Sequence, residues 1–249
     1  FDTPFHQTMP PKAYMFAIPY EYYEKYSIRR YGFHGTSHRY ISGRYTELTG
    51  KAPRLITCHL GNGSSISAIV DGKVQDTSMG LTPLDGFIMG TRCGGIDPSV
   101  VTYIAKKENL TPDQMSDLMN KKSGFLGVSG ISSDCRDIQA AAEAGNERAK
   151  LTLEMLVYQI KKIVGGYAAA MGGVDAIVFT GGIGENDPYI RAAVCADMEY
   201  MGVKVDPEKN NTRSEARISA DDSKVDVWVI PTNEEILIAR DTVALALNK

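Results

Sequence analysis

The stretch that decides the fold is residues 54–78, RLITCHLGNGSSISAIVDGKVQDTS. It begins with a short apolar run, passes through a glycine-containing turn, and continues into two further strand-like runs joined by Asp71 and Gly72. Asp-Gly is the strongest two-residue hairpin signal, because both turn positions need a positive φ. The stretch therefore predicts three adjacent strands, of which the last two form a hairpin.

Outward from this stretch, helical and strand patterns alternate, which predicts an α/β fold. Upstream, residues 36–50 are expected to form a helix capped by Thr36 or Ser37. Downstream, strands are expected at residues 175–182 and 225–232. Further helices are expected at residues 98–109, 112–124, 134–172 with a break near 145, 188–200 and 233–247.

Composition describes an ordinary globular protein. The 249 residues are 43% hydrophobic and 23% charged, with a net charge of -3, which is enough apolar content for one large domain or two small ones. Basic residues are scattered, and the most apolar stretch, residues 163–184, is broken by Asp175 and by glycines. We therefore expect no nucleic-acid or membrane partner. The four cysteines include no C-x-x-C pair, which fits free thiols in a reducing cytoplasm.

Two glycine-rich turns follow predicted strands. In the first, Gly61 and Gly63 flank Asn62, which suits a phosphate cradle, with a plain tight turn as the alternative. The second, residues 180–187, precedes a helix whose N-terminus suits a nucleotide. It lacks the third glycine of a dinucleotide fingerprint, and no G-x-x-x-x-G-K-[ST] sequence occurs. This argues against an NAD-dependent oxidoreductase and a P-loop NTPase. A nucleotide held between two turns is typical of sugar kinases, actin and heat-shock ATPases.

Two histidines and an arginine are candidate polar groups. His34 and His38 have a spacing that can bind metal on a helix, but Gly35 interrupts it and no carboxylate lies between them. We expect His34 to be a directed polar group in a turn and His38 to lie on a helix surface. Arg92 is flanked by glycines, so its guanidinium has little surface to pack on and could meet either an anion or solvent.

Acidic residues at predicted helix starts allow two interpretations. Asp134 could be a simple N-cap, and Glu234 with Glu235 could compensate the dipole of the last helix. Thr232 and Glu235 also have the spacing of a capping box. Each carboxylate could instead serve a ligand, and the spacing leaves this open.

Taken together, the segments resemble the acetate kinase family, within the acetate and sugar kinase, heat-shock protein and actin superfamily. LITCHLGNGSSISAIVDG resembles a family signature along its whole length. The resemblance runs from residue 1 to the last helix and implies an α/β, ribonuclease H-like (actin-like ATPase) domain with a mixed sheet, a hairpin and flanking helices. The other matching segments, in the family's order, are FDTPFHQTMP, RRYGFHGTSH, MGTRCGGID, SSDCRD, TGGIGEN and PTNEE.

The resemblance implies roles for the matching residues. Asp2 matches the essential active-site aspartate. His34 and Arg92 match the pair that stabilises the transition state. Phe33 matches an aromatic residue lining the acetate pocket, and Glu234 the magnesium-associated glutamate. The implied nucleotide-binding residues are His59, Leu60, Gly61, Asn62 and Gly63 at the phosphates, Asp134, Cys135 and Arg136 in a second segment, and Gly182, Ile183, Gly184, Glu185 and Asn186 on the adenosine side.

The implied function is reversible phosphoryl transfer from ATP to acetate, giving ADP and acetyl phosphate, with Mg²⁺ or Mn²⁺, in a cytoplasmic homodimer. Propionate or butyrate kinase is the near alternative, and a non-catalytic actin-like nucleotide-binding module is the alternative of another class. A carboxylic acid with a pKa near ~4.3 is already ionised at neutral pH. Asp2 then has no proton to remove from acetate, and we expect it to organise Mg²⁺ or the Arg92 and His34 pair.

The resemblance assigns residues 1–249 to the C-terminal nucleotide-binding domain of a two-domain carboxylate kinase. The family's N-terminal phosphate and metal motif, and its further substrate arginine, have no counterpart in this sequence. The chain is expected to be a C-terminal portion without the N-terminal domain. We expect this portion to bind nucleotide but to lack kinase turnover on its own. The apolar helix near residues 151–173 is expected to be either core or a dimer interface.

Overall fold

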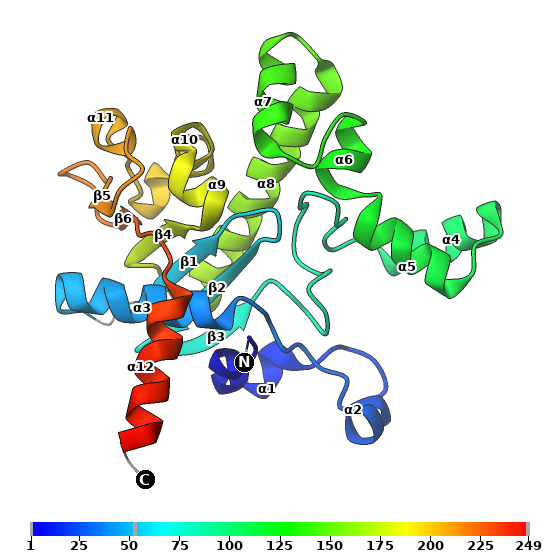
Figure 1. Cartoon of the computed structure of the whole chain (residues 1–249), viewed down its shortest axis with the longest axis horizontal. Coiled ribbons are helices and arrows are strands. Elements are labelled where there is room, and N and C mark those ends of the chain that lie inside the picture. Colours follow the sequence, from blue (N-terminus) through cyan, green and yellow to red (C-terminus); the bar gives the residue numbers. More distant parts are fainter. Residues whose placement is uncertain (1, 52–53, 248–249) are drawn as a thin grey trace.

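The structure, a computed structural model, describes residues 2–51 and 54–247. Within them, six strands form one mixed sheet in the order β3-β2-β1-β4-β6-β5 (Figure 1). β1, β4 and β6 are parallel, and each remaining strand is antiparallel to its neighbour. The predicted α/β class, mixed sheet and hairpin are confirmed. The strands are β1 Leu55–His59, β2 Ser65–Val70, β3 Lys73–Thr77, β4 Ala176–Thr180, β5 Ala216–Arg217 and β6 Asp226–Val229.

The hairpin of β2 and β3 turns where the sequence predicts it. Asp71 and Gly72 have φ angles of 49° and 73°, the left-handed values that such a turn requires. Thr77 at the end of β3 lies opposite Ser67 of β2. This pairing places polar side chains inside the sheet layer, next to the site described below.

Helices of very different lengths surround the sheet. The longest, α8 (Glu147–Ala170), crosses behind the strands in the view of Figure 1. No helix in the described part of the chain is long and apolar enough to cross a membrane. The other helices are α1 Pro11–Tyr14, α2 Glu21–Tyr26, α3 Gly35–Thr49, α4 Pro98–Glu108, α5 Pro112–Lys121, α6 Gly124–Ser129, α7 Cys135–Glu143, α9 Gly181–Asn186, α10 Pro188–Cys195, α11 Pro207–Asn210 and α12 Glu234–Leu247, with 3-10 turns η1 Pro4–Thr8 and η2 Glu199–Met201.

Both faces of the sheet are covered, which explains why β1 is apolar without alternation. Its side chains nevertheless alternate between two cores. Ile56 and Cys58 pack with α8 on one face, whereas Leu55 packs with Ile41 of α3 on the other. Thr57 is therefore directed toward α3, where the histidines of the chain are found.

Helix α8 is built into the core rather than left free. Leu153, Leu156, Ile160 and Val164 follow the helical spacing of three and four residues, and all are buried. The polar side faces solvent together with Tyr158, which is 63% exposed. The core interpretation of this helix accounts for its apolar pattern.

Capping residues predict some helix starts correctly. Asp97 caps α4 by accepting the backbone N–H of Ser99, and Thr111 forms a capping box with Gln114 at α5. Asp134 caps α7 in the same manner, accepting the N–H of Arg136. These caps depend on neighbours within three residues, which is why the sequence reveals them.

Other helix boundaries differ from the prediction. α3 begins at Gly35 with His34, not Thr36 or Ser37, in the N-cap position. α10 ends at Cys195, five residues before the predicted end at residue 200. The predicted capping box of α12 is wrong, because Asn233 rather than Thr232 accepts the N–H of the first turn, from Ile236 at 3.0 Å.

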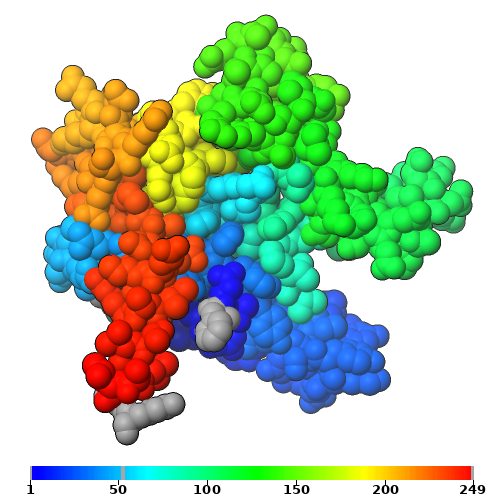
Figure 2. Space-filling view, in the orientation of Figure 1, coloured from blue at the N-terminus to red at the C-terminus, as the bar shows by residue number. Residues whose placement is uncertain are grey.

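Two arms project from the body of the molecule on the same side (Figure 2). One contains α2, and the other contains α4 and α5 (Figure 1). Both carry exposed aromatic residues: Tyr20 is 60% exposed and Tyr26 57% in the first arm, and Tyr103 is 64% exposed in the second. The two arms therefore expose aromatic side chains to solvent.

Candidate functional site

A hollow with a volume of about 920 Å³ collects most of the predicted nucleotide residues. This volume suits a small-molecule site, which typically measures about 300–1,000 Å³. Three separate segments form its wall: the turn after β1, the start of α7, and α9. The predicted residues that line it are Gly61, Asn62, Asp134, Cys135, Arg136, Gly182, Ile183 and Asn186.

The turn after β1 is open toward this hollow. Ser64 closes the turn internally, because its Oγ bonds both the N–H and the carbonyl of Gly61. Among the described residues, no acceptor meets the backbone N–H groups of Asn62 and Gly63. The predicted phosphate cradle therefore has two free donors at its centre.

Leu60 and His59, the other predicted phosphate-binding residues, are hydrogen-bonded within the protein. Leu60 is 1% exposed, its N–H donates to Thr180 O at 2.8 Å, and its carbonyl accepts from α9. His59 is bonded through Nδ1 to Ser37 Oγ at 2.8 Å. Leu60 thus supports the turn and offers no free backbone group to a phosphate.

Arg92 and His34 face the same point beside the turn. A Cβ added to Gly63 would lie 3.2 Å from Arg92 Nη1 and 3.6 Å from His34 Nε2. The guanidinium makes only weak contacts, to Pro83 O at 3.3 Å and Met89 Sδ at 3.8 Å. Among the described residues it has no acidic partner, so its charge remains available to an anion.

The loop that carries Arg92 is shaped to admit the turn. A Cβ on Gly90 would overlap the side-chain oxygen of Asn62, and the N–H of Gly90 donates to the Asn62 carbonyl at 3.1 Å. Gly90 therefore lets the two loops lie backbone against backbone, which brings Arg92 to Gly63.

Asp2 is fixed at the start of α3. Its Oδ2 accepts the N–H of His34 at 2.8 Å, and its carbonyl accepts the N–H of Gly35 at 2.8 Å. His34 has φ 57° and ψ 29°, a left-handed conformation that is uncommon for a residue other than glycine. Asp2 thus holds the backbone that aims the His34 ring. Phe33, directly before it, is half-buried.

The ring of His34 stacks on that of His59, with centroids 4.2 Å apart and planes 23° from parallel. Burial lowers the pKa of His34, and Arg92 lowers it further, while Asp2 acts in the opposite direction. Burial, with the charge of His34, lowers the pKa of His59 to about 3. Two stacked rings cannot both be charged at low cost, so both are neutral at pH 7.

All four histidines of the chain lie in one cluster, which the sequence does not predict. His6 and His38 have ring centroids 5.7 Å apart, and His38 and His59 6.3 Å apart. The expectation that His38 lies on a helix surface is wrong, because its ring is completely buried and bonded at both nitrogens. His34 and His38 are four residues apart, but His6 and His59 are more than 20 positions from either, so the fold brings the cluster together.

Glu234 lies at the first position of α12, within electrostatic range of Asp2. Burial raises the pKa of Glu234, and the charge of Asp2 raises it further. Two carboxylates that disfavour each other's charge are stabilised by a cation between them. Mg²⁺ needs only one or two protein carboxylates when phosphates supply further ligands, so the pair fits this ion. The described residues contain no group of three or more histidine, cysteine or acidic ligands.

The turn after β4 differs from the prediction of a bare helix N-terminus. The N–H groups of Ile183 and Gly184 both donate to Leu60 O, at 2.8 and 3.2 Å. The N–H of Gly181 donates to Glu185 Oε1 at 2.8 Å, and this oxygen also accepts from Thr180 and Thr232. Most donors of α9 are therefore used within the protein, and its contribution to the hollow comes from its outer surface.

At the α7 side of the hollow, Asp134 and Arg136 form an ion pair at 2.6 Å. The hydrogen bonds of Arg136 lower the pKa of Asp134 to about 2. The thiol of Cys135 is buried, which raises its pKa to about 12. Cys135 is therefore an inert wall residue, while the exposed Arg136 is free to reorient toward a ligand.

The hollow also contains residues that the sequence analysis missed. Gln139 lies one helical turn beyond Arg136, so the helical period of α7 could have indicated it. Phe125 comes from α6 and Arg213 from a distant loop, and neither carries a local signal. The missed lining residues are Phe125, Ser133, Gln139, Asp187, Pro188 and Arg213.

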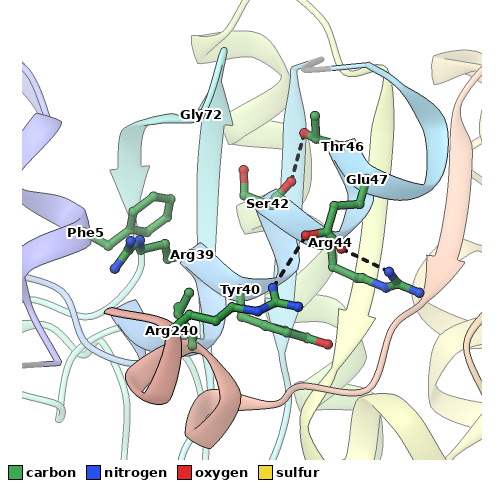
Figure 3. A pocket seen from close by; sticks show the side chains of 11 residues that line it. Phe5, Arg39, Tyr40, Ser42, Arg44, Thr46, Glu47, Gly72 and Arg240 are labelled. Carbon is green, nitrogen blue, oxygen red and sulfur yellow. Dashed lines mark hydrogen bonds and ion pairs between the residues drawn. The ribbon is translucent and has the colours of Figure 1, made fainter. Parts of the chain in front are cut away.

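A second hollow of about 430 Å³ lies between α3 and α12 and contains none of the predicted residues (Figure 3). Its arginines are already paired. Arg44 bonds Glu47 and Glu215, Arg39 bonds Asp241 at 2.6 Å, and Arg240 approaches Glu47 at 3.6 Å. Of these ion pairs, Arg39–Asp241 and Arg240–Glu47 join α12 to α3 across the hollow.

The chain is similar to known proteins along its whole length. The Acetokinase family model matches residues 1–240. The chain is 58% identical to an acetate kinase of Dictyoglomus turgidum and 63% identical to one of Phocaeicola vulgatus, each over 100% of this chain. It covers 62% and 63% of the length of these two relatives.

Solved structures give the same result. The crystal structure of Porphyromonas gingivalis acetate kinase superposes with a TM-score of 0.97 at 53% identity, over 99% of this chain and 63% of that one. A propionate kinase from Francisella tularensis superposes with a TM-score of 0.92 at 45% identity, over 97% of this chain and 62% of that one. The α/β, actin-like ATPase fold implied by the sequence is thus confirmed.

Proposed function

The chain belongs to the acetokinase family, and on that premise we propose that it acts as an ATP:acetate phosphotransferase. The reaction is reversible transfer of the terminal phosphoryl group of ATP to acetate, giving ADP and acetyl phosphate. Residues 1–249 act as the nucleotide-binding domain. The observation that carries the proposal is the turn at residues 61–63, which borders the 920 Å³ hollow on one side and the Arg92 and His34 pair on the other.

The nucleotide occupies the hollow between the turn after β1, α7 and α9. The free N–H groups of Asn62 and Gly63 bind phosphate oxygens, as backbone amides do in other anion sites. Asp134, Arg136 and the outer face of α9 hold the nucleoside end. This orientation places the terminal phosphate next to Gly63, where Arg92 and His34 converge.

Phosphoryl transfer is catalysed mainly by positioning and by charge around the equatorial oxygens. Arg92 supplies a permanent positive charge. His34, whose pKa is lowered by burial, supplies a neutral hydrogen-bond donor. Acetate is ionised at neutral pH and needs no general base. Asp2 accordingly acts through the backbone of His34, and Phe33 borders the acetate pocket.

Asp2 and Glu234 are the residues that would hold Mg²⁺ or Mn²⁺, because the pKa of Glu234 is raised by burial and by the nearby charge of Asp2. When bound, the ion neutralises phosphate charge. We further propose a cytoplasmic homodimer in which the exposed tyrosines of the two arms contribute to the contact. Four free cysteines are consistent with a reducing compartment.

Propionate is a second candidate substrate, because a propionate kinase superposes on nearly the whole chain. One methylene changes substrate preference only about 10–200-fold. The test measures formation of acetyl phosphate, trapped as the hydroxamate, by a protein that carries this chain together with an N-terminal domain of the family, and compares acetate, propionate and butyrate by kcat/KM. A non-catalytic nucleotide-binding module would bind ATP and release no carboxylate-dependent ADP, which would contradict the proposal.

A matched pair of arginine variants tests the site. Arg92→Gln should lower kcat about 10²–10³-fold, as expected for a group that contacts the transition state. Arg240→Gln, in the α3 and α12 hollow, removes the same charge far from the turn and should change kcat less than about threefold. Equal effects of the two substitutions would argue against the assignment of Arg92.

A further inference from the structure

A continuous line of hydrogen bonds leads from the interior of the sheet to His34. Thr57 Oγ1 lies 2.7 Å from His38 Nδ1, and His38 Nε2 lies 2.7 Å from Ser65 Oγ. Ser65 Oγ in turn lies 2.9 Å from His34 Nδ1. Two strands and a helix contribute to this line: β1, β2 and α3.

The line is sealed from solvent. Thr57, His38 and Ser65 are each 0% exposed. A buried hydroxyl or imidazole must direct its proton to an acceptor within the protein, because no bulk water can receive it. The distances within the line therefore decide where each proton lies.

Three assignments of the protons are possible. If His34 carries its proton on Nδ1 and every bond points inward, the proton of Thr57 must go to Ser67 O at 3.5 Å. If Ser65 instead accepts from both histidines, its own proton must go to Phe33 O at 3.4 Å. Both distances are well beyond the usual 2.5–3.0 Å of an O–H···O bond.

The third assignment uses only short bonds. Thr57 O–H donates to His38 Nδ1, His38 Nε2–H donates to Ser65 Oγ, and Ser65 O–H donates to His34 Nδ1. No bond in this direction exceeds 2.9 Å. Neutral His34 then carries its single proton on Nε2, the nitrogen that faces Gly63 and Arg92.

We propose that Thr57, His38 and Ser65 are positioning residues that fix His34 as the Nε2–H tautomer, so that it presents a donor to the transferred phosphoryl group. The inference rests on the proposed function for the identity of that group. With the opposite tautomer, a lone pair of His34 would face an anionic oxygen. The line of hydrogen bonds therefore determines which of the two neutral tautomers of His34 faces the phosphate. It does so without adding a charge to the core.

The tautomer can be read without any substrate. In protein labelled with ¹⁵N at histidine, two-bond ¹H–¹⁵N correlation spectra at pH 7.5 distinguish Nε2–H from Nδ1–H rings, and His34→Gln identifies the His34 signals. The wild type should show His34 as Nε2–H. Ser65→Ala, which removes the hydroxyl that donates to His34 Nδ1, should produce a mixture of tautomers, whereas Thr57→Ser, which keeps the hydroxyl bonded to His38, should retain the wild-type pattern.

The matched control is Ser67→Ala. Ser67 is as buried as Ser65 and lies on the same strand, but it bonds His6 and Thr77 instead. Ser65→Ala should shift the His34 tautomer and lower kcat about tenfold or more with little change in the KM for ATP, while Ser67→Ala should do neither. Circular dichroism and thermal melting confirm that each variant is folded.

Two results would overturn the proposal: an Nδ1–H ring at His34 in the wild type, or an unchanged tautomer in folded Ser65→Ala. If the tautomer shifts as expected but the wild-type chain, combined with an N-terminal domain of the family, forms no acyl phosphate from any carboxylate, the proposed function fails and the tautomer assignment remains. The two failures are therefore distinguishable.

Discussion

The two glycine-rich turns, after β1 and after β4, look alike in sequence and differ in structure. The first leaves the N–H groups of Asn62 and Gly63 without an acceptor among the described residues. The second closes into α9, with its N–H groups bonded to Leu60 O and to Glu185. Glycine content alone thus does not distinguish a turn that binds a ligand from a turn that braces its neighbour.

A buried arginine keeps the second turn closed. Arg191 of α10 is 0% exposed and donates to the carbonyls of Gly184 and Glu185, each at 2.9 Å. Its other bonds go to Asn210 and to the Thr212 carbonyl. Among the described residues no carboxylate pairs with it. At the open turn, by contrast, Arg92 makes only weak contacts within the protein. Its guanidinium therefore remains able to bind a ligand.

The largest expected effect comes from opening the closed turn. Arg191→Met should destabilise the protein by about 3–5 kcal/mol, because several buried carbonyls lose their donors at once. Urea denaturation measures this loss. Arg213→Met is the control, since Arg213 is exposed and its replacement should change stability by less than about 0.5 kcal/mol. Comparable losses in both variants would show that Arg191 does not brace α9.

A second prediction compares one glycine from each turn. Gly181 has φ 77°, and a Cβ there would lie 2.8 Å from Leu60 O, so Gly181→Ala should cost about 2–3 kcal/mol of stability. Gly63→Ala meets only the Arg92 and His34 side chains. It should cost less than about 1 kcal/mol but reduce kcat at least about tenfold. Reversal of the two effects would contradict the distinction between closed and open turns.

These results show what the sequence can predict. The hairpin at Asp71 and the cap at Asp97 follow from neighbouring residues, and both are confirmed. His38 bonds partners 19 and 27 positions away, and Arg191 joins α9 to carbonyls 19 and 21 positions further along the chain. No local pattern encodes such partners. The site residues came from a family resemblance, which names positions but does not show which groups are already bonded.

A third prediction concerns pH. Titratable histidines lie next to the open turn, whereas the closed turn is braced by Arg191, whose charge does not change in this pH range. Burial lowers the pKa of His6 to about 4 and that of His59 to about 3. Below the ordinary value near 6.5, the unfolded chain binds protons that the folded chain does not, so stability falls as the pH falls through this window. His6 alone should cost roughly 2 kcal/mol between pH 6.5 and 5.

The measurement is urea denaturation at pH 7, 6 and 5, combined with hydrogen exchange. Amides of β1 and β2 should lose protection before those of α9 and α10. His6→Gln keeps a donor toward Ser67 and removes one titrating group, so it should flatten the dependence on pH. A stability that is constant from pH 7 to pH 5 would show that the cluster is not held neutral.

The smallest expected effect concerns Glu185, which the family resemblance places on the adenosine side. Its Oε1 accepts from Thr180, Gly181 and Thr232. Glu185→Gln keeps an acceptor oxygen but loses the charge, and charge-assisted bonds are about twice as strong as neutral ones. We expect a loss of about 1 kcal/mol in stability and a KM for ATP within about twofold of wild type. If Glu185 instead contacts the nucleotide, the KM rises with stability unchanged, and the second turn would have to open when ATP binds.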